Sequence, residues 1–229
     1  MPSAPELRMH EELLLMALDD EKGSIRATNF KYALCAGLLA ELVLEERVTL
    51  ERGSKPSKDR IIPANPKLLS DPLLDEILRK VHGSKKPRSP KEWVSKLSGV
   101  SALRKRVGTG LVRRGVLRER NARVLLLFPW TYYPLLDPAP KRRLVERIRA
   151  AVVGDHELDE RTAIVVAVAS VTGVLKPVLG KQVLKDRKAR IEQIAEDQYI
   201  AAATKKAVQE AAAAAAASCT AFLVAAAMY

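Results

Sequence analysis

The segment from Thr28 to Leu44 constrains the fold more than any other part of the chain. It is rich in leucine and alanine and carries the apolar periodicity of an α-helix. Its small residues would let a neighbouring helix approach closely: Ala33, Ala36, Gly37 and Ala40. Aromatic residues make up only 4% of the chain and alanine crowds its C-terminal quarter, which indicates close-packed helices and argues against an all-β fold. We therefore expect a mainly α protein.

Other segments also carry helix periodicity or helix-start residues. Ser70-Asp71-Pro72, a capping residue followed by an acid and a proline, predicts the start of one helix. The further helices are expected at about 7–18, 73–81, 93–97, 100–114, 141–152, 161–171, 183–200 and 204–228. A short strand is expected at Arg47–Glu51, with at most one more at Arg60–Ile62.

The length and composition predict one domain. With 229 residues and 48% hydrophobic content, the chain can bury a sizeable core, so we expect a single domain over residues 1–229 with basic loops at 52–67 and 83–90. The stretch 211–229 has no charge over 19 residues, which is near the length of a membrane span. It is mostly alanine, which adds little insertion energy, so a buried Ala-rich helix at 204–228 is favoured.

Sequence motifs for catalysis are weak. Gly108-Thr-Gly110 lies in or beside a helix and does not follow a strand, as a dinucleotide fingerprint would. Gly173 and Gly180 have six residues between them where a phosphate loop has four, and Gln182 stands where Ser or Thr would bind magnesium. No nucleophile elbow or paired metal-binding histidines occur. We expect no enzyme, no catalytic residues and no cofactor.

Cysteines and histidines argue against a metal site. Cys35 and Cys219 are the only cysteines, too few for a disulfide framework or a structural zinc site, and a reducing cytosol fits best. His10, His82 and His156 lie far apart without ligand-type neighbours, so we expect ordinary surface or capping residues and no metal.

Positive charge is concentrated in one stretch. The chain carries a net charge of +12, and Arg79–Arg123 holds fifteen Lys or Arg against two acids, Glu92 and Glu119. Such a block indicates a surface that binds phosphate groups of a membrane or a nucleic acid. The alternative is that these basic residues only make the exposed helix faces soluble and bind no ligand.

An apolar hairpin is expected beside this basic block. Val116–Phe128 has the pattern of two short strands around a polar turn that contains Asn121. Leucine and phenylalanine at its tip, next to Trp130, are typical of groups that enter a lipid interface, and basic charge supplies the second signal that reversible attachment needs. The alternative is a core strand with Phe128 and Trp130 packed inward. Regular structure is expected to be interrupted until Lys141 by four prolines: Pro129, Pro134, Pro138 and Pro140.

Six runs of residues resemble the Golgi phosphoprotein 3 family, in the family's order and at similar spacing. They are Glu11–Gly23, Gly37–Glu51, Asp71–Leu78, Trp93–Gly99, Leu111–Leu117 and Leu125–Phe128. The resemblance extends from about Leu7 to Leu179. The resemblance implies a central helix bundle ringed by amphipathic helices, with a protruding β-hairpin.

The resemblance also implies a function. Members of this family are cytoplasmic, peripherally membrane-associated proteins that recognise phosphatidylinositol 4-phosphate, lay a basic face on the bilayer and insert an apolar hairpin. In eukaryotes they bind the cytosolic tails of Golgi glycosyltransferases, and the hairpin can contact another subunit, so a homo-oligomer is one expectation. The basic helix corresponds to Val100–Arg114 here and the hairpin to Val116–Phe128.

The lipid site implied by the resemblance is only partly matched. Arg104 and Arg106 match two of three family arginines, and Ser101 stands at the place of the first. Arg26 and Cys35 stand where the family has a tryptophan and an arginine. These departures favour a divergent member of the family that binds anionic headgroups less selectively. A prokaryotic source is compatible with them.

The residues expected at the membrane fall into two groups. The headgroup-binding group is Arg104, Arg106, Arg26, Lys105, Arg113 and Arg114, and the membrane-inserting group is Leu125, Leu126, Leu127, Phe128 and Trp130. Two alternatives remain open. A helix followed by a hairpin is also the outline of a winged helix that binds DNA phosphates, and an adaptor for protein partners that has lost lipid binding would explain the missing matches.

Overall fold

The computed structural model describes residues 6–54, 58–124, 128–154 and 158–196. In chain order its elements are α1 (Met9–Ala17), α2 (Phe30–Leu44), β1 (Val48–Glu51), β2 (Arg60–Pro63), α3 (Pro72–His82), α4 (Pro90–Ser98), α5 (Leu103–Arg113), β3 (Arg120–Val124), β4 (Phe128–Tyr132), α6 (Ala139–Val153), α7 (Glu160–Val171), α8 (Leu175–Asp186) and α9 (Lys188–Glu196). Within these ranges the strands form only two antiparallel pairs, β1 with β2 and β3 with β4. The mainly α prediction is confirmed.

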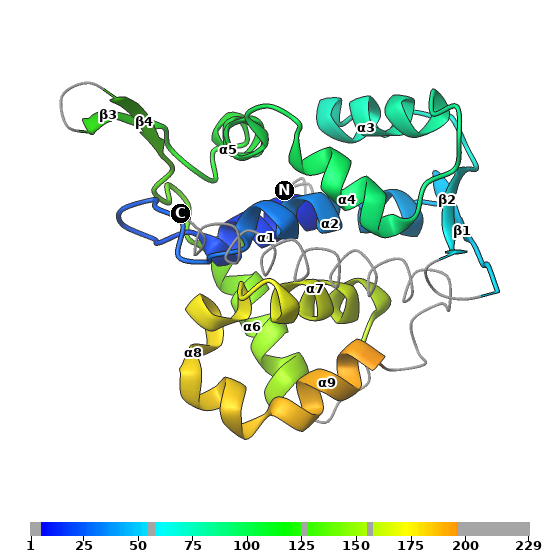
Figure 1. Cartoon of the computed structure of the whole chain (residues 1–229). Helices are drawn as coiled ribbons and strands as arrows, with labels where there is room; N and C mark the ends of the chain where they lie inside the picture. Colours follow the sequence, from blue (N-terminus) through cyan, green and yellow to red (C-terminus); the bar gives the residue numbers. More distant parts are fainter. Residues whose placement is uncertain (1–5, 55–57, 125–127, 155–157, 197–229) are drawn as a thin grey trace, which may run out of the picture.

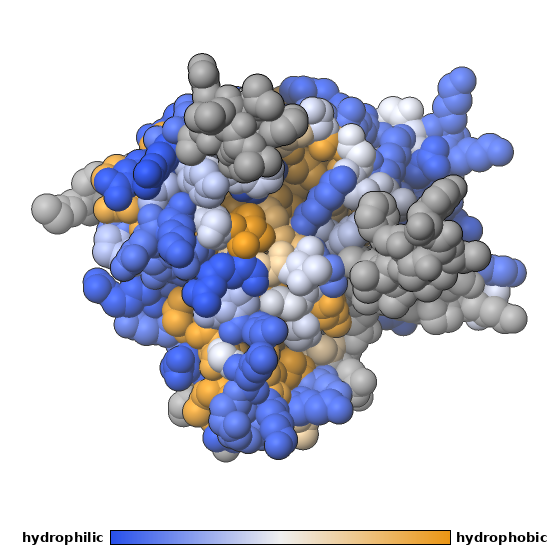
Figure 2. Space-filling model, turned by 60° about the vertical axis from the view of Figure 1, so that its left-hand side comes forward, coloured by the Kyte–Doolittle hydropathy of each residue, from blue (hydrophilic) through white to orange (hydrophobic). Residues whose placement is uncertain are grey.

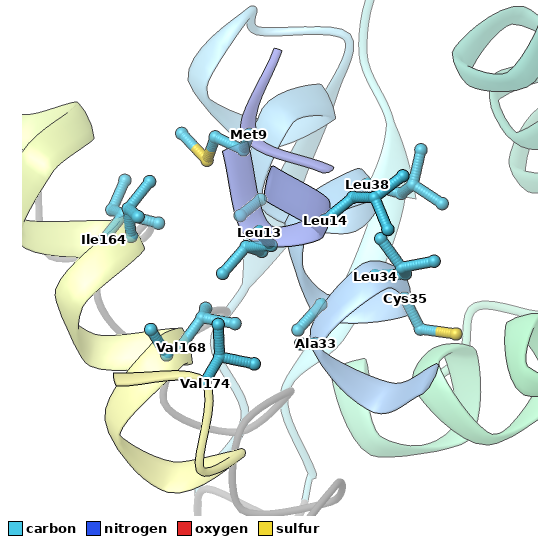
Figure 3. Close-up of a cluster of buried hydrophobic side chains, with 14 of the residues drawn as sticks. Met9, Leu13, Leu14, Ala33, Leu34, Cys35, Leu38, Ile164, Val168 and Val174 are labelled. Atoms are coloured by element: carbon cyan, nitrogen blue, oxygen red, sulfur yellow. The ribbon is translucent and has the colours of Figure 1, made fainter. Parts of the chain in front are cut away.

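Helix α1 lies at the centre of the molecule. Every one of its residues is buried, and it contacts α2, α5, α6, α7 and α8. Figure 1 shows α1 and α2 between the group α3–α5 on one side and the group α6–α9 on the other. In the core, Leu13 of α1 lies between Ile164 and Val168 of α7 and Ala33 of α2 (Figure 3). A helix that is covered on all sides in this way must be apolar around most of its circumference.

The close approach of α1 and α2 depends on Gly37. A Cβ atom at this position would lie 2.6 Å from Cδ1 of Leu13 and 3.3 Å from the backbone nitrogen of His10. The expectation that the small residues of the second helix admit a neighbour is therefore confirmed.

The polar residues of α1 are buried together with partners. His10 is 2% exposed, with its Nε2 3.6 Å from Oδ2 of Asp71, so the expectation of a surface or capping histidine was wrong. Glu11 pairs with Arg114, and Glu12 accepts a hydrogen bond of 2.8 Å from Arg147. The histidine lies on a helix that packs against α2 and beside Asp71, the residue that caps α3, and neither contact could be seen from its isolated place in the sequence.

Local capping sets where helices α3 and α4 begin. Oδ1 of Asp71 accepts hydrogen bonds from the backbone nitrogens of Leu73 and Leu74, both at 2.9 Å, and Pro72 occupies the first turn, as predicted. Ser89 and Glu92 form a capping box at the start of α4.

Two expected helices have different boundaries. The basic helix begins at Leu103 and not at Val100, because Ala102 takes a left-handed conformation with φ of 54°. The helix expected at 183–200 begins earlier, as α8, and a break at Arg187 separates it from α9. Inside α8, Gly180 has φ of 79°, a value that glycine adopts without strain and that kinks the helix.

The hairpin is present, but its expected register was wrong. Asn121 does not lie in the turn; it lies in β3 opposite Thr131, whose Oγ1 donates a 2.9 Å hydrogen bond to Asn121 Oδ1. Pro129 lies in β4 opposite Arg123, so the prolines do not exclude regular structure before Lys141, and α6 already begins at Ala139. Both strands of a two-stranded sheet are edges, where a proline is tolerated. Leu125, Leu126 and Leu127 lie outside the described residues.

The base of the hairpin is attached to the loop after α1. The backbone nitrogen of Tyr133 donates to the carbonyl of Gly23 at 3.1 Å, and that of Leu135 donates to Asp20 at 3.0 Å. Gly23 has φ of 65°, and a Cβ atom there would lie 2.2 Å from the backbone of Tyr133 and Pro134. Only glycine fits this contact, which places the hairpin beside the loop that carries Arg26.

Among the described residues, no single helix is long and apolar enough to cross a membrane, although α7 and α8 together, bent by 82°, reach the required length and composition. The Ala-rich segment at 204–228 lies outside the described residues, and the single domain over 1–229 stays a prediction. The buried apolar residues of the described helices belong to one continuous core.

Candidate functional site

Arg104 lies in the first turn of α5, and its side chain reaches strand β4. Its Nη2 donates a 3.0 Å hydrogen bond to the backbone carbonyl of Thr131. Its guanidinium carbon lies 4.6 Å from the centroid of the Trp130 ring and 6.0 Å from that of Tyr133. The side chain is thus held by the hairpin on one edge and on one face.

The structure shows no acidic partner for Arg104 among the described residues. Among the described residues, no carboxylate oxygen lies within ion-pair distance of its guanidinium, although the residue is partly buried. Burial lowers the pKa of Arg104 from its ordinary value because a desolvated cation is less stable, while the neighbouring tyrosines oppose this effect. A cation that has lost part of its water and has no counter-ion favours the approach of an anion.

The junction of α5 and the hairpin is tightly packed around Tyr133. This residue is fully buried, and its hydroxyl lies 3.4 Å from the carbonyl oxygen of Lys105, to which it donates. A Cβ atom at Gly108 would lie 2.7 Å from the Tyr133 ring. The absence of a side chain at position 108 therefore allows the hairpin to rest on the helix that carries Arg104.

Arg106, two residues further along α5, has a different environment. Its Nη2 lies 2.6 Å from Oε2 of Glu76 on α3, which also pairs with Lys80 at 3.3 Å. The hydrogen bond from Arg106 lowers the pKa of Glu76, so this carboxylate stays charged and neutralises the arginine. Arg106 is therefore paired with a carboxylate, whereas Arg104 contacts a carbonyl and aromatic rings and pairs with no carboxylate among the described residues.

The other expected headgroup-binding residues are dispersed around this site. Arg114 pairs with Glu11 and lines a cavity of about 510 Å³ together with Glu12, Arg143 and Arg147. Lys105 and Arg113 are exposed on α5.

The two other positions that depart from the family pattern differ from each other. Arg26 is exposed, with its Nη1 3.7 Å from Oδ2 of Asp19. Cys35 is buried inside α2, and burial raises the pKa of its thiol to about 12, so it does not offer a charged group to a headgroup.

The apolar part of the hairpin is described only at its strands. Phe128 begins β4, and the Trp130 side chain is 47% exposed, so the alternative in which Trp130 packs into the core was wrong. Leu136, which follows the hairpin, is 59% exposed. Figure 1 shows the hairpin projecting from the body, and the side that carries it comes forward in Figure 2, where hydrophilic side chains surround apolar patches.

The sequence pattern of the Golgi phosphoprotein 3 family matches residues 9–211 of this chain. The chain belongs to the Golgi phosphoprotein 3 family. It is also similar to the vacuolar protein sorting-associated protein 74 of Eremothecium gossypii, with 32% identity over 167 residues, which cover 65% of this chain and 50% of that protein. The chain therefore spans about half the length of this curated relative.

The part that matches the Golgi phosphoprotein 3 family runs from the start of α1 past the end of α9, so it includes the whole candidate site. Sequence reasoning found Arg104 but missed its contact with Trp130, because it considered the tryptophan only as a group at the lipid interface. It also missed Glu76 as the partner of Arg106. The two residues are 30 positions apart, and no local pattern links them.

Proposed function

We propose that this member of the Golgi phosphoprotein 3 family is a peripheral membrane protein that binds anionic lipid headgroups through α5 and the β3–β4 hairpin. Phosphoinositides such as phosphatidylinositol 4-phosphate are the favoured class. The observation that carries the proposal is Arg104, a partly buried cation without a carboxylate partner among the described residues, beside the exposed Trp130. No catalytic role is proposed.

Charge and apolar character together support this proposal. The basic block Arg79–Arg123 carries fifteen cations against two acids and includes α5 and β3. Each basic residue near an anionic surface contributes about 1 kcal/mol of binding free energy, and the contributions of several residues add together. The apolar sequence Leu125–Phe128 supplies the second signal that stable attachment needs.

The relatives suggest where such a protein works. The family is named for the Golgi, and the similar protein of Eremothecium gossypii is named for vacuolar protein sorting. We propose a cytoplasmic protein on the surface of an internal or plasma membrane, with cytosolic tails of membrane proteins as further partners and self-association through the hairpin.

Sedimentation with vesicles tests the function directly. The protein is mixed with neutral vesicles, with vesicles that contain phosphatidylinositol 4-phosphate, and with vesicles of equal charge made with another anionic lipid, each at low and high salt. We expect binding to both anionic vesicles, strongest to the phosphoinositide. Failure to bind any anionic vesicle would contradict the proposal, and binding to duplex DNA alone would favour the winged-helix alternative.

Arg104 and Arg106 form a matched pair of test positions on one helix. Arg104→Ala should weaken binding to phosphoinositide vesicles by at least about ten-fold, because it removes a charge-assisted hydrogen bond. Arg106→Ala removes the same charge and should weaken binding by about five-fold or less, the effect of one charge near the surface. Equal losses would mean that a diffuse basic face binds the lipid and that Arg104 has no special role.

A further inference from the structure

We infer that Trp130 is a positioning residue for Arg104: its ring holds the guanidinium so that the free edge captures a phosphomonoester before the hairpin enters a membrane. This inference rests on the proposed function and adds a residue to its site. Neither the charge pattern nor the family match assigns a role to the Trp130 ring face.

The geometry restrains the guanidinium in two directions. The guanidinium carbon lies over the Trp130 ring, 4.6 Å from its centroid, and one N–H of Nη2 is bonded to the Thr131 carbonyl at 3.0 Å. A guanidinium has five N–H donors, so the contacts among described residues leave most of them unused. A flat cation that is stacked on a ring and bonded at one edge still presents another edge to a ligand.

The ligand that suits this edge is a phosphomonoester. Two parallel N–H groups of arginine match two oxygens of a phosphate group, and the charged hydrogen bonds are stronger than neutral ones. Because the folded protein has already restrained Arg104, binding the phosphate loses less side-chain entropy than it would at a freely rotating arginine. The position of Trp130 thus increases affinity for the headgroup itself.

The exposure of Trp130 allows a competing role. The ring is 47% exposed, and tryptophan also anchors proteins at the depth of lipid headgroups. The two roles differ in one respect. A membrane anchor acts only when a bilayer is present, whereas a positioning residue also affects the binding of a headgroup free in solution.

The experiment titrates the full chain with soluble inositol 1,4-bisphosphate by calorimetry or NMR, with uncharged inositol as the control ligand. The variants are Trp130→Leu, which keeps an apolar side chain without a ring, and Trp130→Phe, which restores a ring face. Trp130→Leu should weaken binding about five-fold, the size of a partly exposed cation–π contact, and Trp130→Phe should stay within about two-fold of the parent. Circular dichroism should be the same for all three proteins.

The outcomes distinguish a positioning role of Trp130 from a membrane-anchoring role, and both from failure of the proposed lipid site. If Trp130→Leu binds the soluble headgroup as the parent does but sediments less with vesicles, Trp130 is a membrane anchor, and the inference fails while the proposed function stands. No binding of the soluble headgroup by the parent, or equal weakening by the leucine and phenylalanine variants, would also overturn the inference. If Arg104→Ala and the parent sediment equally with vesicles, the proposed site itself is wrong.

Discussion

Arg161 and Arg104 show two opposite ways to hold an arginine in one small protein. Arg161 on α7 donates two hydrogen bonds, at 2.8 and 2.9 Å, to the fully buried carboxylate of Glu41, which also pairs with Arg8. Arg104 on α5 is held by an aromatic ring and one carbonyl, with no carboxylate among the described residues. The first arrangement joins helices, and the second leaves a charge available.

The difference follows from position. Inside the core, a charge without a partner is strongly destabilising, so Glu41 is surrounded by two arginines and the backbone nitrogen of Met9, which donates at 2.8 Å. Beside the hairpin, Arg104 is only partly buried, so the fold tolerates this cation without a carboxylate partner among the described residues. Under the proposed function, stability and ligand binding therefore depend on different arginines.

The largest expected effect comes from the buried network. Glu41→Gln removes the buried carboxylate that joins Arg8 and Arg161, so among the described residues these partly buried cations keep only the more exposed carboxylates of Glu45 and Glu6. The free energy of unfolding should fall by about 3–5 kcal/mol in a urea titration, the usual result of breaking a buried ion pair on one side.

Glu45 provides the matched control for Glu41. It also pairs with Arg8, but its side chain is 33% exposed. Glu45→Gln should lower the free energy of unfolding by less than about 1 kcal/mol. Similar losses for both variants would mean that burial of the Glu41 network does not distinguish it from a surface pair.

The next effect concerns the junction under Arg104. Gly108→Ala places a methyl group 2.7 Å from the Tyr133 ring, which has no room to move in the core, so the free energy of unfolding should fall by about 1–3 kcal/mol. At Gly110, two residues further along α5, a Cβ atom meets nothing within 4 Å. Gly110→Ala should therefore stabilise the helix by about 0.5–1 kcal/mol, and thermal melts of both variants would show shifts of opposite sign. A neutral result at position 108 would mean that the hairpin does not rest firmly on α5.

The smallest effect is a pH dependence in the interior. Burial lowers the pKa of His10, while the charges of Asp71, Glu11 and Glu41 oppose this shift and Arg8 adds to it. The native state therefore holds the neutral imidazole, and its stabilising effect is complete above the unfolded pKa of about 6.5. As the pH falls below that value, the unfolded state gains a proton first, so stability should decrease by at most about 1.4 kcal/mol per pH unit.

The pH effect is read as a difference between proteins. His10→Gln should show a flatter dependence of unfolding free energy on pH between about pH 4.5 and pH 7 than the parent chain. Equal slopes for the two proteins would contradict the assignment to His10.

The elements that sequence reasoning located best carry strong local signals. Asp71 with Pro72, and Ser89 with Glu92, mark helix starts because their side chains satisfy backbone groups within four residues. The hairpin was placed in the wrong register because its polar Asn121 was taken as a turn residue. Its amide is instead satisfied across the ladder by Thr131, a contact that no local pattern encodes.

For this protein, the sequence alone determines the helical class, the family and the concentration of positive charge between Arg79 and Arg123. These properties depend on composition and on neighbours close in the chain. Only the tertiary structure decides which of those charges is free. It brings Glu76 to Arg106 across 30 residues and Trp130 to Arg104 across the hairpin, so that identical side chains on one helix differ in their partners. The physical reason is that the interaction energy of a charge depends on distance and solvent access, which chain folding sets.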